Sequence, residues 1–304
     1  MKKITGFLAL TLVAVSLSAC ASGNPLATPT AGGGSAAGQA IVVGSANFPE
    51  SELLAEIYAG ALKAKGITVT TKLNIASRET YVPALKNGEI DLIPEYTGAF
   101  AKYLNADADT SDEAAALASL RAALPATLQA LEPSAAQDKD SISVTQATAD
   151  KYSLTSIEDL AQYAPEMVLG GPPEWKERAA GVPGLEKVYG LRFKAFKPLD
   201  VAGPLTVQAL KNGQVQAANL FTTDPAIKAN GFVVLDDPKS FFGAQNVIPV
   251  ITKAKATPEA VAALNGVSAK LDTDMLATLV TKVVVDKADA ADVAAEWLKA
   301  NGLS

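Results

Sequence analysis

The sequence predicts an α/β protein of two lobes, each with a mostly parallel sheet flanked by helices. Short apolar segments alternate with longer segments of helical periodicity along most of the chain, and this alternation is typical of βαβ units. The chain has 304 residues, of which 49% are hydrophobic, so it can form one large or two ordinary domains. In addition, one segment of the first half recurs in the second half, which favours two similar lobes.

The repeated segment starts at Ala84 and starts again at Ala209, at an offset of 125 positions. Both copies begin Ala-Leu-Lys-Asn-Gly and continue into a short apolar stretch. Gly88 and Gly213 occupy the same place in the two copies and suit the left-handed conformation that commonly ends a helix. Each copy therefore predicts a helix, a glycine stop and a strand.

An aromatic residue and a threonine follow the predicted strand in each copy, as Tyr96-Thr97 and as Phe221-Thr222. Ligands of open α/β sheets bind outside the carboxyl ends of the strands. We therefore expect these four residues to bind a ligand in a cleft between the lobes. The alternative is that Tyr96 and Phe221 are ordinary core rings at strand ends.

The composition excludes several classes of function. The formal net charge of −6 argues against nucleic acid as a partner. The chain has no histidine, which excludes Ser-His-Asp and Cys-His catalysis and histidine-ligated metal sites. Its single cysteine, Cys20, excludes an intramolecular disulfide. We expect neither a cofactor nor a metal.

Residues 1–19 are predicted to be a lipoprotein signal peptide. Lys2 and Lys3 form its positive end, and the apolar stretch that follows is too short to span a membrane. The Leu-Ser-Ala sequence before Cys20 resembles the lipobox of bacterial lipoproteins, in which the cysteine sulfur carries the lipid. We expect lipid attachment at Cys20, a flexible tether over residues 20–39, and anchoring on the extracytoplasmic face of the cell membrane.

The first lobe is predicted to contain residues 40–143 and 250–304, and the second lobe residues 144–249. In chain order, the expected strands lie at 41–44, 67–73, 90–93, 142–144, 167–170, 215–218, 232–235 and 247–251. The expected helices lie at 49–65, 79–86, 111–131 with a break or kink at Pro125, 149–160, 182–191, 205–211, 258–271, 272–285 and 289–300. The chain passes between the lobes near 140–146 and again near 245–252.

Ser45 and Asn47 lie in the turn between the first strand and the first helix. Backbone N–H groups at a helix N-terminus favour an anion, so this turn is a candidate site for a ligand carboxylate. The alternative is that the two side chains only cap the helix.

Several motifs together resemble the substrate-binding lipoproteins of osmoprotectant ABC importers, which bind glycine betaine, carnitine and choline. The two most specific motifs are Pro-Glu-Tyr-Thr-Gly at 94–98 and Phe-Thr-Thr-Asp at 221–224. Val-Gly-Ser at 43–45, Asn-Phe at 47–48, and the segments at 183–190 and 244–249 fit the same family. The resemblance covers most of residues 41–300.

The resemblance implies a two-lobed periplasmic-binding-protein fold of type II that closes on its ligand and delivers it to the permease subunits of an ABC importer. It also implies an aromatic cage around a quaternary ammonium group, a cation that cannot donate hydrogen bonds and is recognised by ring faces. The candidate rings are Tyr96, Trp175 and Phe221, and the candidate polar contacts are Thr97, Thr222 and Arg178. We further expect a monomer that is not an enzyme.

For two of these residues the sequence leaves an alternative. Trp175 lies in a Pro-rich loop, where a large ring can simply cover the core. Arg178 lies close to Glu174 and Glu177 and can form solvent-exposed pairs that contribute little.

At three positions the sequence departs from the family pattern. Ala46 stands where the family commonly has lysine or another polar residue, and Ile93 and Ile142 stand where it often has an aromatic residue. These departures imply one contact fewer for a ligand carboxylate and fewer aromatic rings in the cage. Alternatively, the ligand is another small polar solute.

Two other classes of function stay open on the sequence. A secreted hydrolase would use Glu95 and Asp224 as an acid–base pair, although these carboxylates equally suit loop orientation and a helix N-cap. A purely structural lipoprotein would have no ligand cleft between its lobes.

Overall fold

The computed structural model describes residues 40–304. The predicted signal peptide, the tether and Cys20 lie outside this range. Within residues 40–304, no helix combines the length and the apolar character that crossing a membrane requires.

The first sheet has five strands in the order β2-β1-β3-β10-β4. These are β1 (Ile41–Gly44), β2 (Val69–Lys72), β3 (Leu92–Tyr96), β4 (Leu128–Ala130) and β10 (Val247–Thr252). Strand β1 pairs in parallel with β2 and β3, whereas β10 pairs antiparallel with β3 and β4.

The second sheet also has five strands, in the order β7-β6-β8-β5-β9. These are β5 (Asp140–Thr145), β6 (Val168–Gly171), β7 (Ala195–Pro198), β8 (Ala217–Phe221) and β9 (Phe232–Val234). Strand β6 pairs in parallel with β7 and β8, whereas β5 pairs antiparallel with β8 and β9.

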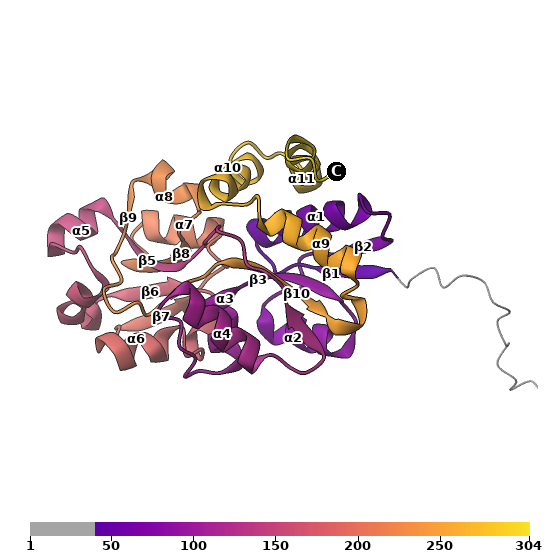
Figure 1. The fold of residues 1–304 in the computed structure, drawn as a ribbon. Coiled ribbons are helices and arrows are strands. Elements are labelled where there is room, and N and C mark those ends of the chain that lie inside the picture. The colour runs from indigo at the N-terminus through magenta and orange to yellow at the C-terminus, as the bar shows by residue number, and fades with distance from the viewer. Residues whose placement is uncertain (1–39) are drawn as a thin grey trace, which may run out of the picture. The chain divides into compact units, whose positions relative to one another are not determined.

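Each sheet with its helices forms one lobe, and the chain passes between the lobes twice, from β4 to β5 and from β9 to β10 (Figure 1). The predicted two-lobed α/β fold is confirmed, but the sheets are mixed rather than mostly parallel. The reason is that β5 and β10, the strands that enter each sheet from the other lobe, run antiparallel to both of their neighbours. The lobe boundaries at 143 and 249 stay a prediction.

Helices flank both sheets (Figure 1). Those of the first lobe are α1 (Pro49–Lys63), α2 (Arg78–Asn87), α3 (Thr97–Leu104), α4 (Glu113–Ala123), α9 (Pro258–Ser268), α10 (Thr273–Val284) and α11 (Ala290–Ala300). Those of the second lobe are α5 (Gln146–Tyr152), α6 (Val182–Tyr189), α7 (Pro204–Lys211) and α8 (Pro225–Asn230). Short 3₁₀ helices lie at η1 (Ile157–Gln162), η2 (Ala164–Glu166), η3 (Pro173–Lys176) and η4 (Lys253–Lys255).

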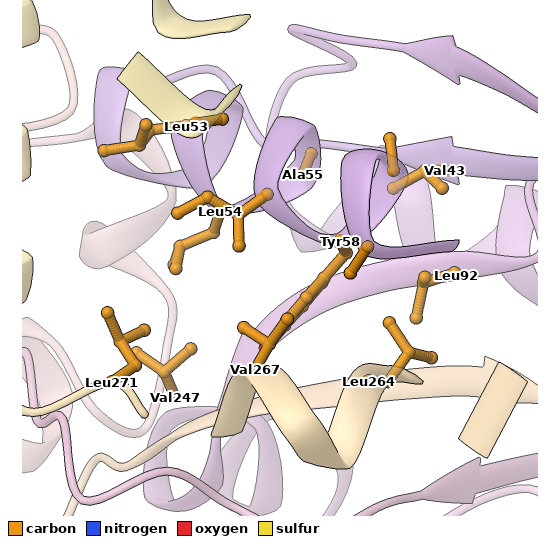
Figure 2. Packing of buried hydrophobic residues seen from close by; sticks show 14 of the residues in the cluster. Val43, Leu53, Leu54, Ala55, Tyr58, Leu92, Val247, Leu264, Val267 and Leu271 are labelled. Atoms are coloured by element: carbon orange, nitrogen blue, oxygen red, sulfur yellow. The ribbon is translucent and has the colours of Figure 1, made fainter. Parts of the chain in front are cut away.

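Helix α1 is the centre of the main hydrophobic core. Proline at its first position and two glutamates in its first turn favour the helix start. Leu53, Leu54 and Tyr58 are buried between β3, β10 and the helices α9 to α11. Figure 2 shows Tyr58 extending toward Val267 of α9. Burial of α1 therefore fixes the turn before it, which is part of the site described below.

The side chains of strand β10 pack alternately into a hydrophobic core on each face of the first sheet. Val247 and Ile251 belong to the core under α1, whereas Ile248 and Val250 point to a second core formed with α2, α3 and α4. This alternation with a period of two is the one expected for a strand. Because the strand is buried on both sides, every one of its six residues is buried.

The internal repeat has a structural counterpart. Gly88 and Gly213 both have a left-handed backbone, with φ of +74° and +68°. Leu85 and Leu210, which also correspond, are both fully buried. The corresponding strands β3 and β8 end later than predicted, so that Tyr96 and Phe221 are the last residues of the strands and do not follow them.

The predicted helix over 111–131 is wrong in its second half. Helix α4 ends at Ala123, and Leu124 is already extended with φ −62° and ψ 138°. Proline at 125 disfavours a helical conformation in the residue before it, so the chain leaves the helix there and forms β4. The sequence patterns also missed α3, β7 and α8, which are short.

We predict that Leu53→Ala lowers the free energy of unfolding by about 2–5 kcal/mol, because it leaves a cavity in the main core. Leu205→Ala on α7 is the matched control, since this leucine is 65% exposed and its truncation should change the free energy by less than about 0.5 kcal/mol. Urea unfolding of both variants measures the difference. Equal effects would contradict the assignment of α1 to the core.

Candidate functional site

A cavity with about 600 Å³ of empty space, including its open mouth, is lined by residues of both lobes. Its walls come from the turn before α1, the start of α2, the ends of β3 and β8, the passage from β4 to β5, and the loop around η3. The carboxyl ends of parallel strands therefore converge on it, as expected for a ligand site in α/β sheets.

Three aromatic rings from different segments gather in this cavity. The ring centroid of Phe48 lies 5.1 Å from that of Phe221 and 6.3 Å from that of Tyr96. Phe48 and Tyr96 belong to the first lobe and Phe221 to the second. The two residues matched by the internal repeat are thus joined through a third ring.

The turn before α1 places Phe48 there. Phe48 is the N-cap residue of α1 and is extended, with φ −145° and ψ 153°, and Pro49 begins the helix. The hydroxyl Oγ of Ser51 accepts a hydrogen bond from the backbone N–H of Ala46 at 2.9 Å, which closes the turn. The ring of Phe48 is therefore held over the cavity by the start of a buried helix.

Trp175 and Arg178 reach the same cavity from the loop after β6. Trp175 is only 2% exposed and stacks on Phe242 with 5.9 Å between ring centroids, so most of its ring also belongs to the core of the second lobe. It contributes a wall of the cavity rather than a free ring.

Arg178 joins the two lobes through an ion pair with Glu79 of α2. Its Nε donates to Glu79 Oε1 at 2.9 Å and its Nη2 to Glu79 Oε2 at 2.7 Å. Partial burial acts to raise the pKa of Glu79, but the hydrogen bonds from Arg178 and Ser77 outweigh it and lower that pKa to about 2. Glu174 lies 3.7 Å from the same guanidinium.

A second arginine, Arg78, is held by a buried carboxylate inside the first lobe. Its Nε and Nη2 donate to Glu95 at 2.9 and 2.7 Å. Glu95 is fully buried and also accepts from the hydroxyl of Tyr81 at 2.7 Å and from the backbone N–H of Tyr96 at 3.1 Å. This network fixes both Arg78 and the end of β3.

A buried carboxyl of α1, Glu50, connects a ring of the cavity to the second lobe. The hydroxyl of Tyr96 donates to Glu50 Oε1 at 2.7 Å, and the hydroxyl of Thr223 donates to Glu50 Oε2 at 2.6 Å. Asp138, in the passage from β4 to β5, accepts from the backbone N–H of Thr223 at 3.0 Å and lies close enough to Glu50 for each acid to affect the pKa of the other. Two carboxyl groups thus meet in one buried cluster.

Burial sets the protonation of the acids at this cavity. It raises the pKa of Glu50 and of Asp138, and for Asp138 the neighbouring Glu50 charge adds to the effect. Burial also raises the pKa of Asp140, which accepts from the side-chain amide of Asn219 at 2.9 Å. A bound cation would offset the desolvation of these carboxylates.

All eight predicted ligand-binding residues lie within residues 40–304, and five of them line the cavity: Asn47, Tyr96, Trp175, Arg178 and Phe221. The hydroxyls of the other three are bonded to nearby backbone. Ser45 accepts from the N–H of Asn74, Thr97 accepts from the N–H of Asn246, and Thr222 accepts from the N–H of Lys139.

Other lining residues were missed by sequence reasoning. In the sequence, Phe48 stands out only as part of the Asn-Phe motif. The signal that could have identified it is its position between a predicted strand and a helix that begins with proline. Arg78, Asp138 and Asp140 also line the cavity. No pattern along the chain brings them together, since they meet only through tertiary contacts.

The three departures from the family pattern lie in different surroundings. Ala46 lines the cavity, so no side chain beyond its methyl group reaches in from that point. Ile93 is fully buried in the core under α2 to α4, and Ile142 is fully buried in the core of the second lobe.

The carboxylates considered for hydrolysis have structural partners. Glu95 is held by Arg78 and Tyr81, and Asp224 is the N-cap of α8 and accepts from the N–H of Ala226 at 2.8 Å. Neither residue lines the aromatic cavity. Within residues 40–304, no group of three or more potential ligands is arranged to hold a metal ion.

Comparisons with known proteins all indicate the same family of substrate-binding proteins. The OpuAC family model, described as the substrate binding domain of an ABC-type glycine betaine transport system, matches residues 39–300. The glycine betaine-binding protein YehZ of Escherichia coli is 30% identical over 279 residues, which are 86% of this chain and 90% of that protein.

Two further relatives agree with this match. The carnitine transport binding protein OpuCC of Listeria monocytogenes is 25% identical over 86% of both chains. A solved structure described as a glycine betaine/carnitine/choline ABC transporter shares the fold, with a TM-score of 0.67 at 24% identity over 86% of this chain and 99% of that chain.

We predict that Asp138→Asn makes the stability less dependent on pH. A carboxyl whose pKa is raised by folding contributes stability that is complete below its unfolded pKa of about 3.9 and is lost as the pH rises through its folded pKa. Asparagine resembles the protonated acid, because it can accept from Thr223 and donate to Glu50. From pH 5 to pH 8, urea unfolding should therefore show a smaller loss of stability in the variant than in the wild type. Parallel pH profiles would contradict this prediction.

Proposed function

The chain belongs to the family of substrate-binding domains of ABC-type glycine betaine transport systems, and on this premise we propose that it captures a quaternary ammonium osmoprotectant and delivers it to an ABC permease. The observation that carries the proposal is the group of three rings, Phe48, Tyr96 and Phe221, at a cavity lined by both lobes.

Ring faces suit this class of ligand for a physical reason. The methyl groups of a quaternary ammonium spread its charge and offer no hydrogen-bond donor, so polar side chains gain little from it. The negative face of an aromatic ring attracts the cation by roughly 0.5–2 kcal/mol per contact, and most when water is excluded. Carboxyl groups nearby, such as the half-buried Asp140, add long-range attraction.

Binding is coupled to closure of the lobes. The rings come from both lobes, so a ligand that touches all of them holds the lobes together. Two contacts already link the lobes beside the cavity, the ion pair between Arg178 and Glu79 and the hydrogen bond from Thr223 to Glu50. Opening breaks both contacts, and closing around a ligand restores them while it buries the rings.

The protein acts as a monomer outside the cytoplasm, anchored by a lipid on Cys20, and presents the loaded form to the permease. Residues 20–39 give the binding domain reach from the membrane surface. The proposed role requires no chemistry on the ligand, and the two carboxylates of the hydrolase alternative, Glu95 and Asp224, are hydrogen-bonded within the protein.

We predict that Tyr96→Ala weakens the binding of quaternary amines about two- to thirtyfold, because it removes one ring face that contributes roughly 0.5–2 kcal/mol. Calorimetric titration with glycine betaine, choline and carnitine measures this. Tyr96→Phe should retain most of the affinity, since it keeps the ring and loses only the bond to Glu50. Tyr152→Ala is the control, because Tyr152 lies on α5 and its ring packs on Tyr163, outside the cavity.

Three results would contradict the proposal. These are the absence of heat with every quaternary amine, unchanged affinity in Tyr96→Ala, and X-ray scattering curves that are identical with and without saturating ligand.

We predict that Cys20→Ser moves the protein from the membrane fraction to the soluble extracytoplasmic fraction, because serine cannot form the thioether to the lipid. Metabolic labelling with a radioactive fatty acid should mark the wild type and not the variant. Retention of the variant in the membrane fraction would contradict the proposed anchor.

A further inference from the structure

The walls of the aromatic cavity carry an excess of carboxyl groups. Asp138, Asp140 and Glu174 line it together with two cationic residues, Arg78 and Arg178. Behind this lining lies Glu50, a buried carboxyl group whose charge acts on Asp138. The lining alone therefore holds three acidic side chains against two basic ones.

Both arginines are already paired with carboxylates of the protein. Arg78 presents its Nε and Nη2 edge to Glu95, and Arg178 presents the same edge to Glu79. A ligand carboxylate would therefore meet only the remaining Nη1–Nη2 end of either guanidinium, whose charge is already balanced by a glutamate of the protein. The nearby Lys102 donates to the carbonyl oxygen of Phe241 and lines a neighbouring hollow.

Asp140, in contrast, is held by a neutral group. Its Oδ1 accepts from the Nδ2 of Asn219 at 2.9 Å, and the two arginines that attract it are bound to glutamates. Position 46 also lines the cavity, and a lysine there would offset the negative charge of Asp140, but this chain has alanine. The cavity therefore combines three ring faces with an acidic side chain that has no cation in direct contact.

We propose that this cavity selects quaternary ammonium compounds of net charge +1, whose third arm ends in a hydroxyl or another uncharged group, over zwitterions that carry a carboxylate. This inference rests on the proposed function and narrows its ligand class. Choline and glycine betaine are the matched probes, because both carry a trimethylammonium group and differ in a CH₂OH or a carboxylate group.

The physical reason is the balance of charges in the cavity. The trimethylammonium group gains from the rings in both ligands alike. The carboxylate of glycine betaine enters next to Asp140 and Glu174 and is repelled, whereas the hydroxyl of choline can donate a hydrogen bond to a carboxylate. At a separation of about 5 Å in a protein interior, such repulsion is large enough to favour choline at least about tenfold.

Calorimetric titration of the purified protein with choline and with glycine betaine tests the proposal. The wild type should bind choline at least about tenfold more tightly. Asp140→Asn should weaken choline binding and leave glycine betaine binding unchanged or stronger, so the ratio of the two affinities falls. Asparagine keeps the size of the side chain, and its Oδ1 can still accept from Asn219.

The control variant is Asp150→Asn, which removes the same charge from an exposed position of α5. It should leave the affinity ratio unchanged. Should Asp140→Asn fail to fold, Glu174→Gln provides a second test, because Glu174 also lines the cavity and its neutralisation should lower the ratio in the same direction.

The outcomes separate this inference from the proposed function. Glycine betaine binding as tightly as choline, or more tightly, would overturn the inference and leave the function intact. An affinity ratio that stays the same in Asp140→Asn, or in Glu174→Gln where that variant stands in for it, would also overturn it. No binding of either compound would contradict the proposed function itself.

Discussion

The two lobes are joined at the site through one buried carboxyl group. Glu50 accepts from Tyr96 in its own lobe and from Thr223 in the other lobe, while it also meets Asp138 in the passage between the lobes. A single side chain at the start of α1 therefore sets the orientation of a ring and the approach of the opposite strand end. Because α1 is packed in the centre of the main core, the position of Glu50 is held by a rigid helix.

Much of the fold was predictable because it rests on local patterns. The repeat predicted two helices that end at Gly88 and Gly213 and two short strands at 90–93 and 215–218, which the structure places two to three residues later. Glycine stops and apolar strands can be recognised because each occupies a short stretch of sequence. The direction of β5 and β10 was not predictable in this way. Each of these strands enters its sheet from the other lobe, and its direction is set by pairing with strands that lie far away in the sequence.

The site was predictable only in part, for a related reason. Rings at strand ends are visible in the sequence, and Tyr96 and Phe221 line the cavity as expected. The charged groups are not visible, because each owes its state to a partner far along the chain. Arg178 meets Glu79 at a separation of 99 positions, and Glu50 meets Thr223 at 173. Sequence reasoning named Arg178 but could not tell that its donor edge was already engaged.

The central place of β10 in the first sheet has a consequence for the order in which the chain folds. Strand β4 is joined to the rest of its sheet only through β10, which lies between it and β3. A chain that crosses the membrane from its N-terminus presents residues 140–234, which hold all five strands of the second sheet, before it presents β10. The lobe that starts first along the sequence is thus the last to be completed, and until Val247–Thr252 emerges, two of its strands have an unpaired edge.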